Sequence, residues 1–257
     1  MNEHRNMLLA ILLSALVLLG WTMLSERFLP VANEPSTKVV KGKTVALPQP
    51  EADPAADSTT VVRNRTVVLA ETPRIVIETP RLKGSLNLRG ARIDDLVLTS
   101  YRESLDANSP PIRLLSPSGS PDAYFAGFGW TGEGARLPDA DTLWRASGTR
   151  LAPGSPVTLS WDNGSGQRFA IRLAVDENYL FTVQQSVANR GAGAIAVRPF
   201  ALVSRVGVSK DPDAWTMHVG PIGVFNDAAE YGVDFDKLLE EGPRRFTTTG
   251  GWLGFGD

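Results

Sequence analysis

The sequence contains no cysteine and only two histidines, His4 and His218, among its 257 residues. The lack of cysteine excludes disulfide bonds, thiol catalysis and cysteine-ligated metal sites. It also suits a compartment in which free thiols would be oxidised. Because His4 lies in the N-terminal flank, a zinc site or a Ser-His-Asp arrangement would depend on His218 alone.

The chain also lacks an excess of charge of either sign. It carries 26 Lys and Arg against 28 Asp and Glu, for a net charge of −2, and its basic residues are scattered. Nucleic-acid binding is therefore excluded as a function class. The hydrophobic content of 42% and charged content of 21% are those of a globular protein. A chain of this size can bury a core without disulfides or metals.

One long apolar run stands near the N-terminus. Residues Met7–Leu24 read MLLAILLSALVLLGWTML, without an ionisable side chain. As a helix at about 1.5 Å per residue the run is about 27 Å long, close to the roughly 30 Å of a bilayer's hydrocarbon core. A cleaved signal peptide would have a shorter apolar region and a small-x-small site, which residues 22–27 do not offer. The sequence therefore predicts an uncleaved transmembrane helix within residues 1–29, with the rest of the chain outside the cytoplasm.

The region after the apolar run changes character twice. Residues 30–58 are rich in proline, alanine and acidic residues, which predicts a flexible, partly extended linker. From 59 to 249 the apolar period becomes two, and short turns separate the runs, which predicts an antiparallel β-sandwich. The expected strands cover Arg74–Thr79, Ala91–Thr99, Val157–Trp161 and the alternating runs that contain Phe169, Phe181 and Val197. Within Ala91–Thr99 the apolar residues Ile93, Leu96 and Leu98 do not alternate perfectly.

Two local patterns refine this picture. The pair Asn163-Gly164 readily takes the positive φ values that a hairpin turn demands. Residues Asp236–Glu241, followed by Gly242 and Pro243, have a capping residue, helix formers and a stop signal. We therefore expect one short C-terminal helix, of about two turns, in a mainly β fold.

Few residue groups suggest chemistry, and a structural interpretation is favoured for each: a turn-facing or strand-end position for Asp94-Asp95, a proline turn for residues 211–213, and a structural or exposed histidine for His218. Asp94-Asp95 could be a carboxylate pair, but neighbours on a strand point to opposite faces, so they should not converge. Asp211-Pro212-Asp213 lacks the further oxygen ligands that a cation needs. His218 lies near Trp215 and Met217 without an identifiable partner for acid-base work. The sequence thus assigns no catalytic, cofactor-binding or metal-ligating residue.

Three further motifs are weak. Residues Gly250–Gly256 lack the lysine of a phosphate loop and suit a hinge or an approach to a membrane surface. The triplets Asn64-Arg65-Thr66 and Asn163-Gly164-Ser165 match the glycosylation pattern, which is short enough to occur by chance.

Four stretches give the chain a resemblance to a known family. The sequence resembles the amino-terminal part of the YidC family of membrane protein insertases of Gram-negative bacteria, particularly its α-proteobacterial members. The resemblance covers essentially the whole chain and is carried by Glu78–Leu96, Leu159–Gly164, His218–Val224 and Gly250–Phe255. It implies a periplasmic domain with the β-supersandwich fold of sugar-mutarotase-like proteins. It also implies residence in the bacterial inner membrane and partnership with the Sec translocon and nascent membrane proteins.

In that family the insertase step belongs to a later helical bundle, in which an arginine in a hydrophilic groove receives the substrate. This sequence has no second apolar run of about 18 residues and ends at Asp257. We therefore carry over no functional residue and expect a fragment of a longer product. Residues 250–257 would begin the connection to the missing bundle.

Two alternative functions are open at this point. The domain could be a carbohydrate-binding or aldose-epimerase-like sandwich, in which Trp130, Trp144 and Trp215 stack on a sugar and His218 acts as acid or base. It could also be an anchored envelope adaptor, although such proteins usually carry long helical hairpins and no long heptad pattern is present.

Overall fold

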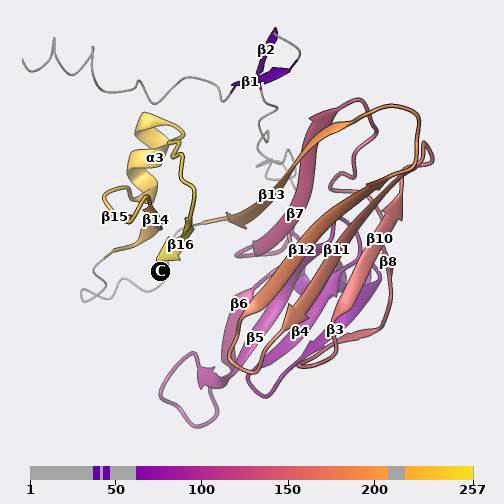
Figure 1. Cartoon of the computed structure of the whole chain (residues 1–257). Helices are drawn as coiled ribbons and strands as arrows, with labels where there is room; N and C mark the ends of the chain where they lie inside the picture. Colours follow the sequence, from indigo (N-terminus) through magenta and orange to yellow (C-terminus); the bar gives the residue numbers. More distant parts are fainter. Residues whose placement is uncertain (1–36, 41–42, 47–61, 208–217, 257) are drawn as a thin grey trace, which may run out of the picture. The chain divides into compact units, whose positions relative to one another are not determined.

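The computed structural model describes residues 37–40, 43–46, 62–207 and 218–256 (Figure 1). These residues belong to two compact units, one built from 1–46 and 211–257 and the other from 47–210. Within the described ranges, no helix is both long enough and apolar enough to cross a membrane. The predicted transmembrane helix Met7–Leu24 lies outside these ranges, and so does Asp211-Pro212-Asp213.

The larger unit contains a seven-stranded sheet. Its strands are antiparallel except for the parallel pair β3 and β9. Their order is β13-β7-β5-β4-β3-β9, and β6 pairs with β5 outside this path. The strands are β3 (Arg74–Glu78), β4 (Leu82–Asn87), β5 (Arg92–Arg102), β6 (Pro111–Leu115), β7 (Tyr124–Glu133), β9 (Arg150–Leu151) and β13 (Ala196–Arg205). A short helix, α2 (Arg65–Ala70), precedes them.

A four-stranded sheet faces the larger one. It is an antiparallel meander in the order β12-β11-β10-β8. Its strands are β8 (Arg145–Ala146), β10 (Val157–Asp162), β11 (Gln167–Val175) and β12 (Phe181–Asn189). The predicted mainly β, antiparallel fold is confirmed, and the expected strands in both sheets are present within a few residues of their predicted limits.

The turn between β10 and β11 works differently from the prediction. Positive φ values occur at Gly164 (80°) and Gly166 (92°), whereas Asn163 does not take one. The buried side chain of Asn163 instead accepts hydrogen bonds from the backbone N–H groups of Ser165 (2.9 Å) and Gln167 (3.2 Å). Asparagine thus stabilises this turn through its side-chain oxygen, as Asx turns do.

One apolar core joins the two sheets. The inward residues of β11, Phe169, Ile171 and Leu173, are all 0% exposed, and they pack with buried residues of β3, β4 and β5. Two tryptophans, Trp130 and Trp144, belong to the same core; Trp130 meets the ring of Phe169 edge-on, with the ring centres 5.2 Å apart. The alternation of apolar and polar residues along β11 is what places one face of the strand in this core.

Two short strands lie within the predicted linker 30–58. Strands β1 (Thr37–Val40) and β2 (Lys43–Ala46) form an antiparallel pair. Their sequences, TKVV and KTVA, are rich in β-branched residues, which favour extended backbone. The rest of 30–58 lies outside the described residues, so its assignment as a linker stays a prediction.

Residues 218–256 form a three-stranded sheet and a helix. The strand order is β15-β14-β16, with β14 (Gly220–Phe225), β15 (Ala228–Glu230) and β16 (Gly251–Gly256). Helix α3 (Phe235–Glu241) matches the predicted C-terminal helix and ends at Gly242, which has φ 81°. Its N-cap is Asp234, whose side chain accepts from the N–H of Lys237 (2.8 Å), so the helix begins one residue earlier than predicted.

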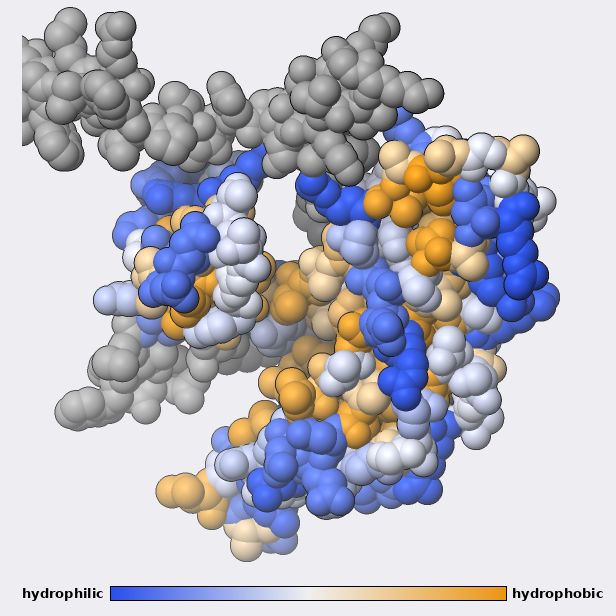
Figure 2. Space-filling model, viewed as in Figure 1, coloured by the Kyte–Doolittle hydropathy of each residue, from blue (hydrophilic) through white to orange (hydrophobic). Residues whose placement is uncertain are grey.

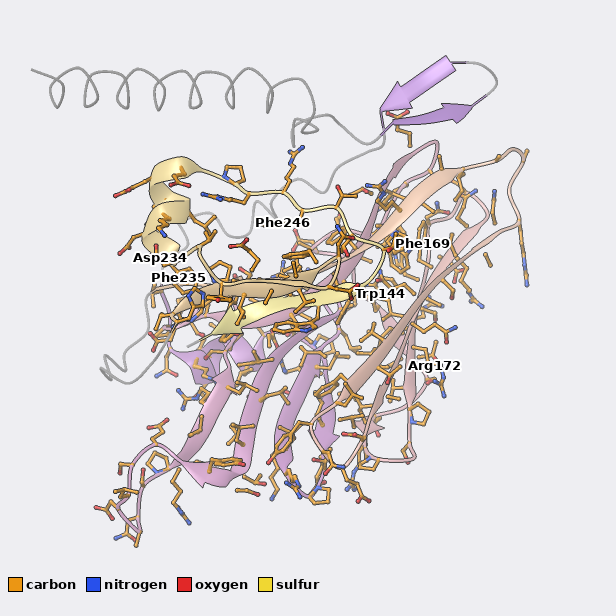
Figure 3. All side chains as sticks on the ribbon, turned by 60° about the vertical axis from the view of Figure 1, so that its left-hand side comes forward. Trp144, Phe169, Arg172, Asp234, Phe235 and Phe246 are labelled. Carbon is orange, nitrogen blue, oxygen red and sulfur yellow. The ribbon has the colours of Figure 1, made fainter. Side chains whose placement is uncertain are left out.

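The position of the core predicts that substitutions of two residues of β11, both labelled in Figure 3, differ strongly in their effect on stability. Phe169→Ala should lower the free energy of unfolding by about 3–5 kcal/mol, because it opens a cavity in the core. Arg172→Ala, on the exposed face of the same strand, should change it by less than about 0.5 kcal/mol. Chemical denaturation followed by tryptophan fluorescence measures both. Equal losses for the two variants would contradict the assignment of the core face.

Candidate functional site

The sandwich has an apolar groove on one side, where β12 faces the larger sheet. The groove has a volume of about 510 Å³, and every residue that lines it is aliphatic or aromatic. The larger sheet contributes residues from β4 to β7, and the smaller sheet contributes β12 and the turn before it. Six of the lining residues are Leu98, Tyr101, Leu114, Phe128, Phe181 and Val183. Figure 2 shows apolar residues gathered on this side of the unit.

The groove exists because β12 is the last strand of the smaller sheet in the described part of the chain. Residues of β11 alternate between buried and accessible, and the apolar ones are fully enclosed. Strand β12 repeats the alternation, but its inward side chains, such as Phe181 and Val183, are only half-buried. Across the gap, Tyr101 and Leu114 are 52% and 41% exposed. The side-chain amide of Gln185 donates to the carbonyl of Gly129 (2.8 Å) and so joins β12 to β7.

Tyr179 lines the groove in an unusual conformation. Its φ is +78°, a value that residues with large side chains seldom adopt. The preceding turn holds it there, because the carboxylate of Asp176 accepts from the N–H groups of Asn178 (2.7 Å) and Leu180 (2.8 Å). The hydroxyl of Tyr179 is buried and has no hydrogen-bond partner in the described part of the chain. Strained backbone is costly, so the turn at Asp176 is what determines the position of the Tyr179 ring beside the groove.

A second notable feature is a polar network on the outer face of the larger sheet. The pairing of β4 with β5 shifts register here, because Ser85 pairs with Asp95 and Leu86 pairs with Ile93. Asp94 is the additional residue of this β-bulge, so Asp94 and Asp95 lie on the same side of the strand. The expectation that the two carboxylates could not converge is therefore wrong. That expectation assumed that successive side chains of the strand alternate between its faces, and the bulge interrupts this alternation at Asp94.

Two arginines and a serine bind this carboxylate pair. Arg74 forms an ion pair with Asp94, and Arg65, the first residue of α2, forms one with Asp95. Ser85 links the two pairs: its hydroxyl accepts from Nε of Arg74 (2.7 Å) and donates to Asp95 (2.6 Å). Each carboxylate is thus engaged with a cation, which suits a structural role rather than acid-base work.

The structure places the other expected residues as follows. Trp130 and Trp144 are 5% and 3% exposed and belong to the core, so neither offers a free face for stacking on a sugar. Nε2 of His218 lies 2.9 Å from the carbonyl oxygen of Pro221. Trp215 and Met217 lie outside the described residues.

The remaining motifs take ordinary structural positions. Residues 251–256 form strand β16, in which Trp252 and Leu253 are exposed. Asn64 is the N-cap of α2, with its side chain accepting from the N–H of Thr66 (2.9 Å). In the ranges that the structure describes, no three His, Asp or Glu side chains gather closely enough to hold a metal ion.

Sequence reasoning missed both the groove and the network. The bulge had a signal: Ile93 and Leu96 are both buried but stand three residues apart, which a regular strand does not allow. Helix α2 had little signal, because its sequence RTVVLA is rich in β-branched residues. The groove depends on where the smaller sheet ends, and no local pattern contains that information.

Burial gives Asp94 a specific effect on stability. Its burial raises the pKa of the Asp94 carboxyl above 3.8, although the neighbouring Arg74 guanidinium opposes the rise. A carboxyl with a raised pKa in the folded state binds its proton more tightly there than in the unfolded chain. The stability that this proton contributes is fully present below pH 3.8 and is lost as the pH rises through the folded pKa.

We therefore expect the difference in unfolding free energy between the wild type and Asp94→Asn to fall with rising pH and then level off. Below the folded pKa the Asp94 carboxyl is neutral, as the amide of the variant is, so the pH dependence belongs to the wild type. Urea denaturation at closely spaced pH values from about 3 to 7 measures this dependence. A difference that does not vary with pH would contradict the assignment.

Comparison with known proteins places the chain in a family. The family described as the YidC periplasmic domain matches residues 74–257. The chain is 42% identical to the membrane protein insertase YidC of Zymomonas mobilis over 100% of its own length and 44% of that relative. It is 39% identical to the membrane protein insertase YidC of Bradyrhizobium diazoefficiens, over 100% of the chain and 45% of that relative. It is 40% identical to the membrane protein insertase YidC of Methylobacterium radiotolerans, over 98% of the chain and 44% of that relative.

The chain thus spans less than half the length of these curated relatives. The match nevertheless includes both sheets of the sandwich, the groove and residues 218–256. It agrees with the four sequence stretches that carried the resemblance. On these grounds the chain belongs to the YidC family of membrane protein insertases.

Proposed function

We propose that this chain is the N-terminal, extracytoplasmic part of a membrane protein insertase that assists the insertion and folding of inner-membrane proteins. The observation that carries this proposal is the family match over residues 74–257, together with relatives that are named for inserting membrane proteins. The step is the partitioning of a polypeptide into the bilayer rather than an enzymatic reaction. The helical bundle of the family, in which that step takes place, lies outside this sequence.

The proposed layout follows the predicted domain limits. Residues 1–29 anchor the chain in the bacterial inner membrane through Met7–Leu24, and 30–58 link the anchor to the domain. Residues 59–249 form the periplasmic domain, and 250–257 begin the connection to the membrane bundle. The two facing, mainly antiparallel sheets support a β-supersandwich of the mutarotase-like kind. We also propose that the complete protein works with the Sec translocon and nascent membrane proteins.

The alternative functions have less support. A sugar site would need accessible aromatic faces and converging acid-base groups, whereas Trp130 and Trp144 are buried in the core. Nε2 of His218 lies within hydrogen-bond distance of the backbone carbonyl of Pro221, an arrangement that does not serve acid-base work. An envelope adaptor would need long helices, and the two helices of the described ranges have six and seven residues.

The proposal predicts the size and location of the native product. An antibody raised against residues 74–207 should detect a membrane protein of more than twice the 27.7 kDa of this chain, because the curated relatives are more than twice as long. The product should resist extraction with alkaline carbonate, as an integral membrane protein does. A membrane-bound product of 27.7 kDa would contradict the proposed insertase function and favour a binding role instead.

A further inference from the structure

The outward face of the smaller sheet gathers arginines that lie far apart in the sequence. Alternate residues of β10 and β11 are buried in the core, so the residues between them point away from it. Arg168 and Arg172 of β11 and Arg145 of β8 are exposed on this outward side. Arg190 is also exposed and follows β12, where its backbone N–H donates to the carbonyl of Gly166 (2.8 Å). We call these four arginines and the sheet surface that carries them the basic face.

The strand register brings three of these arginines into neighbouring rows. Residues that pair directly across two strands have their side chains on the same face of the sheet. Each outward residue of β10 has an arginine as a direct partner on β8 or β11. The pairs are Ser160 with Arg145, Asp162 with Arg168 and Thr158 with Arg172. The fold thus builds a basic surface that no single stretch of the sequence contains.

One carboxylate belongs to this surface. Among the outward positions of the four described strands of the smaller sheet, Asp162 is the one acidic residue. Arg168 binds it through two hydrogen bonds of 3.0 Å, from Nε and from Nη2. These bonds lower the pKa of the Asp162 carboxyl, and the charges of Arg168, Arg145 and Arg190 lower it as well. Three arginines from three parts of the chain therefore converge on one acid, and the basic face keeps an excess of positive charge.

The basic face has charge but no apolar anchor. The other outward residues of β10, β11 and β12 are serine, threonine, alanine and glutamine, without an aromatic or a large aliphatic side chain. Protein interfaces usually centre on buried aromatic or aliphatic residues, which this surface does not offer. Arginine instead binds phosphate groups well, because its planar guanidinium donates two parallel hydrogen bonds. The acids Asp176 and Glu177 lie in the turn after β11, at the opposite end of the β11–β12 ladder from Arg190.

We propose that the basic face docks on the anionic phospholipid headgroups of the membrane in which the chain is anchored. This inference rests on the proposed function, which places the domain beside a bilayer, and goes beyond it by assigning a second contact with lipid. A flexible linker such as the one proposed at 30–58 has a root-mean-square length of roughly 30 Å, so it keeps the domain close to the membrane surface. Because the domain is tethered, weak attraction is enough to hold the face on the headgroups. Each basic residue at an anionic surface strengthens such binding about fivefold.

The direct test measures how close each face of the sandwich comes to the bilayer. The sequence has no cysteine, so Ser186→Cys on the outward side of β12 and Val76→Cys on the outward side of the larger sheet can each carry a single fluorescent dye. The full 257-residue chain is placed in nanodiscs that contain a phospholipid with a nitroxide on its headgroup, which quenches the dye at short range.

The label at Ser186→Cys should be quenched more strongly in discs of equal parts phosphatidylglycerol and phosphatidylcholine than in discs of phosphatidylcholine alone. The label at Val76→Cys should show no such difference. Raising the ionic strength from about 0.05 to about 0.5 M should remove the effect of phosphatidylglycerol, because salt screens the attraction between exposed charges. Quenching at Ser186→Cys that does not depend on phosphatidylglycerol would overturn the proposal.

Matched variants locate the site. Arg145→Gln and Arg172→Gln each remove one exposed charge from the basic face, so each should lower the equilibrium constant for docking about fivefold, as calculated from the quenched fraction. Arg113→Gln removes an exposed charge from β6 of the larger sheet and should leave docking unchanged. All three variants should keep the unfolding midpoint of the wild type, because the substituted side chains are exposed. Equal effects of the three variants on docking would overturn the proposal.

An acidic protein surface is the other partner that this charge would attract, and it has a distinct signature. The label at Ser186→Cys would then stay unquenched in nanodiscs of either composition, while crosslinking from the same cysteine in native membranes would capture a protein in a salt-dependent manner. That result would overturn the proposal. Absence of docking beside a large, membrane-bound native product would remove this inference alone, because the proposed function is tested by the mass of that product.

Discussion

The burial of one face of β11 is the constraint on which the rest of the domain depends. This strand lies in the interior of the smaller sheet and directs Phe169, Ile171 and Leu173 toward the larger one. Each fully buried side chain of this size contributes about 1.5–3 kcal/mol through the hydrophobic effect. A shift of one residue in its register would turn the whole set toward solvent. The alternation along β11 therefore fixes how the two sheets face each other, and with it the position of β12 and the groove.

The same arrangement explains why the groove is open. Inward side chains are fully enclosed on β11 but half-exposed on β12, because among the described strands β12 has a neighbour on one edge only. Strands β5 and β6 of the larger sheet line the open side of the groove, and Tyr101 and Leu114 on these strands remain accessible. The two sheets of the sandwich thus differ in extent, and the apolar surface left over by the larger sheet is concentrated at one edge. Such a surface is informative because proteins rarely expose large contiguous apolar patches.

Much of the fold could be predicted from the sequence, and less of the site. Strands such as β11 follow from strict alternation, and helix α3 follows from its Gly242-Pro243 stop. The relation of Asp94 to Asp95 could not be predicted by assuming a regular strand, although the spacing of Ile93 and Leu96 recorded the bulge. The partners Arg65 and Arg74 lie 30 and 20 residues away in sequence, so their pairing depends on tertiary contacts. The strained φ of Tyr179 likewise arises from the turn at Asp176 and not from the preference of tyrosine.

The ion pair between Arg65 and Asp95 has a mechanical consequence. Helix α2 is the first described element of the large unit, and it is bound through this pair to β5, an interior strand of the seven-stranded sheet. A pulling force applied through the preceding chain would therefore reach the middle of the sheet before any terminal strand. Interior strands are held by ladders on both sides, so they resist load better than an edge strand that can be peeled away one hydrogen bond at a time. The network gives the domain a firm point of attachment on its N-terminal side.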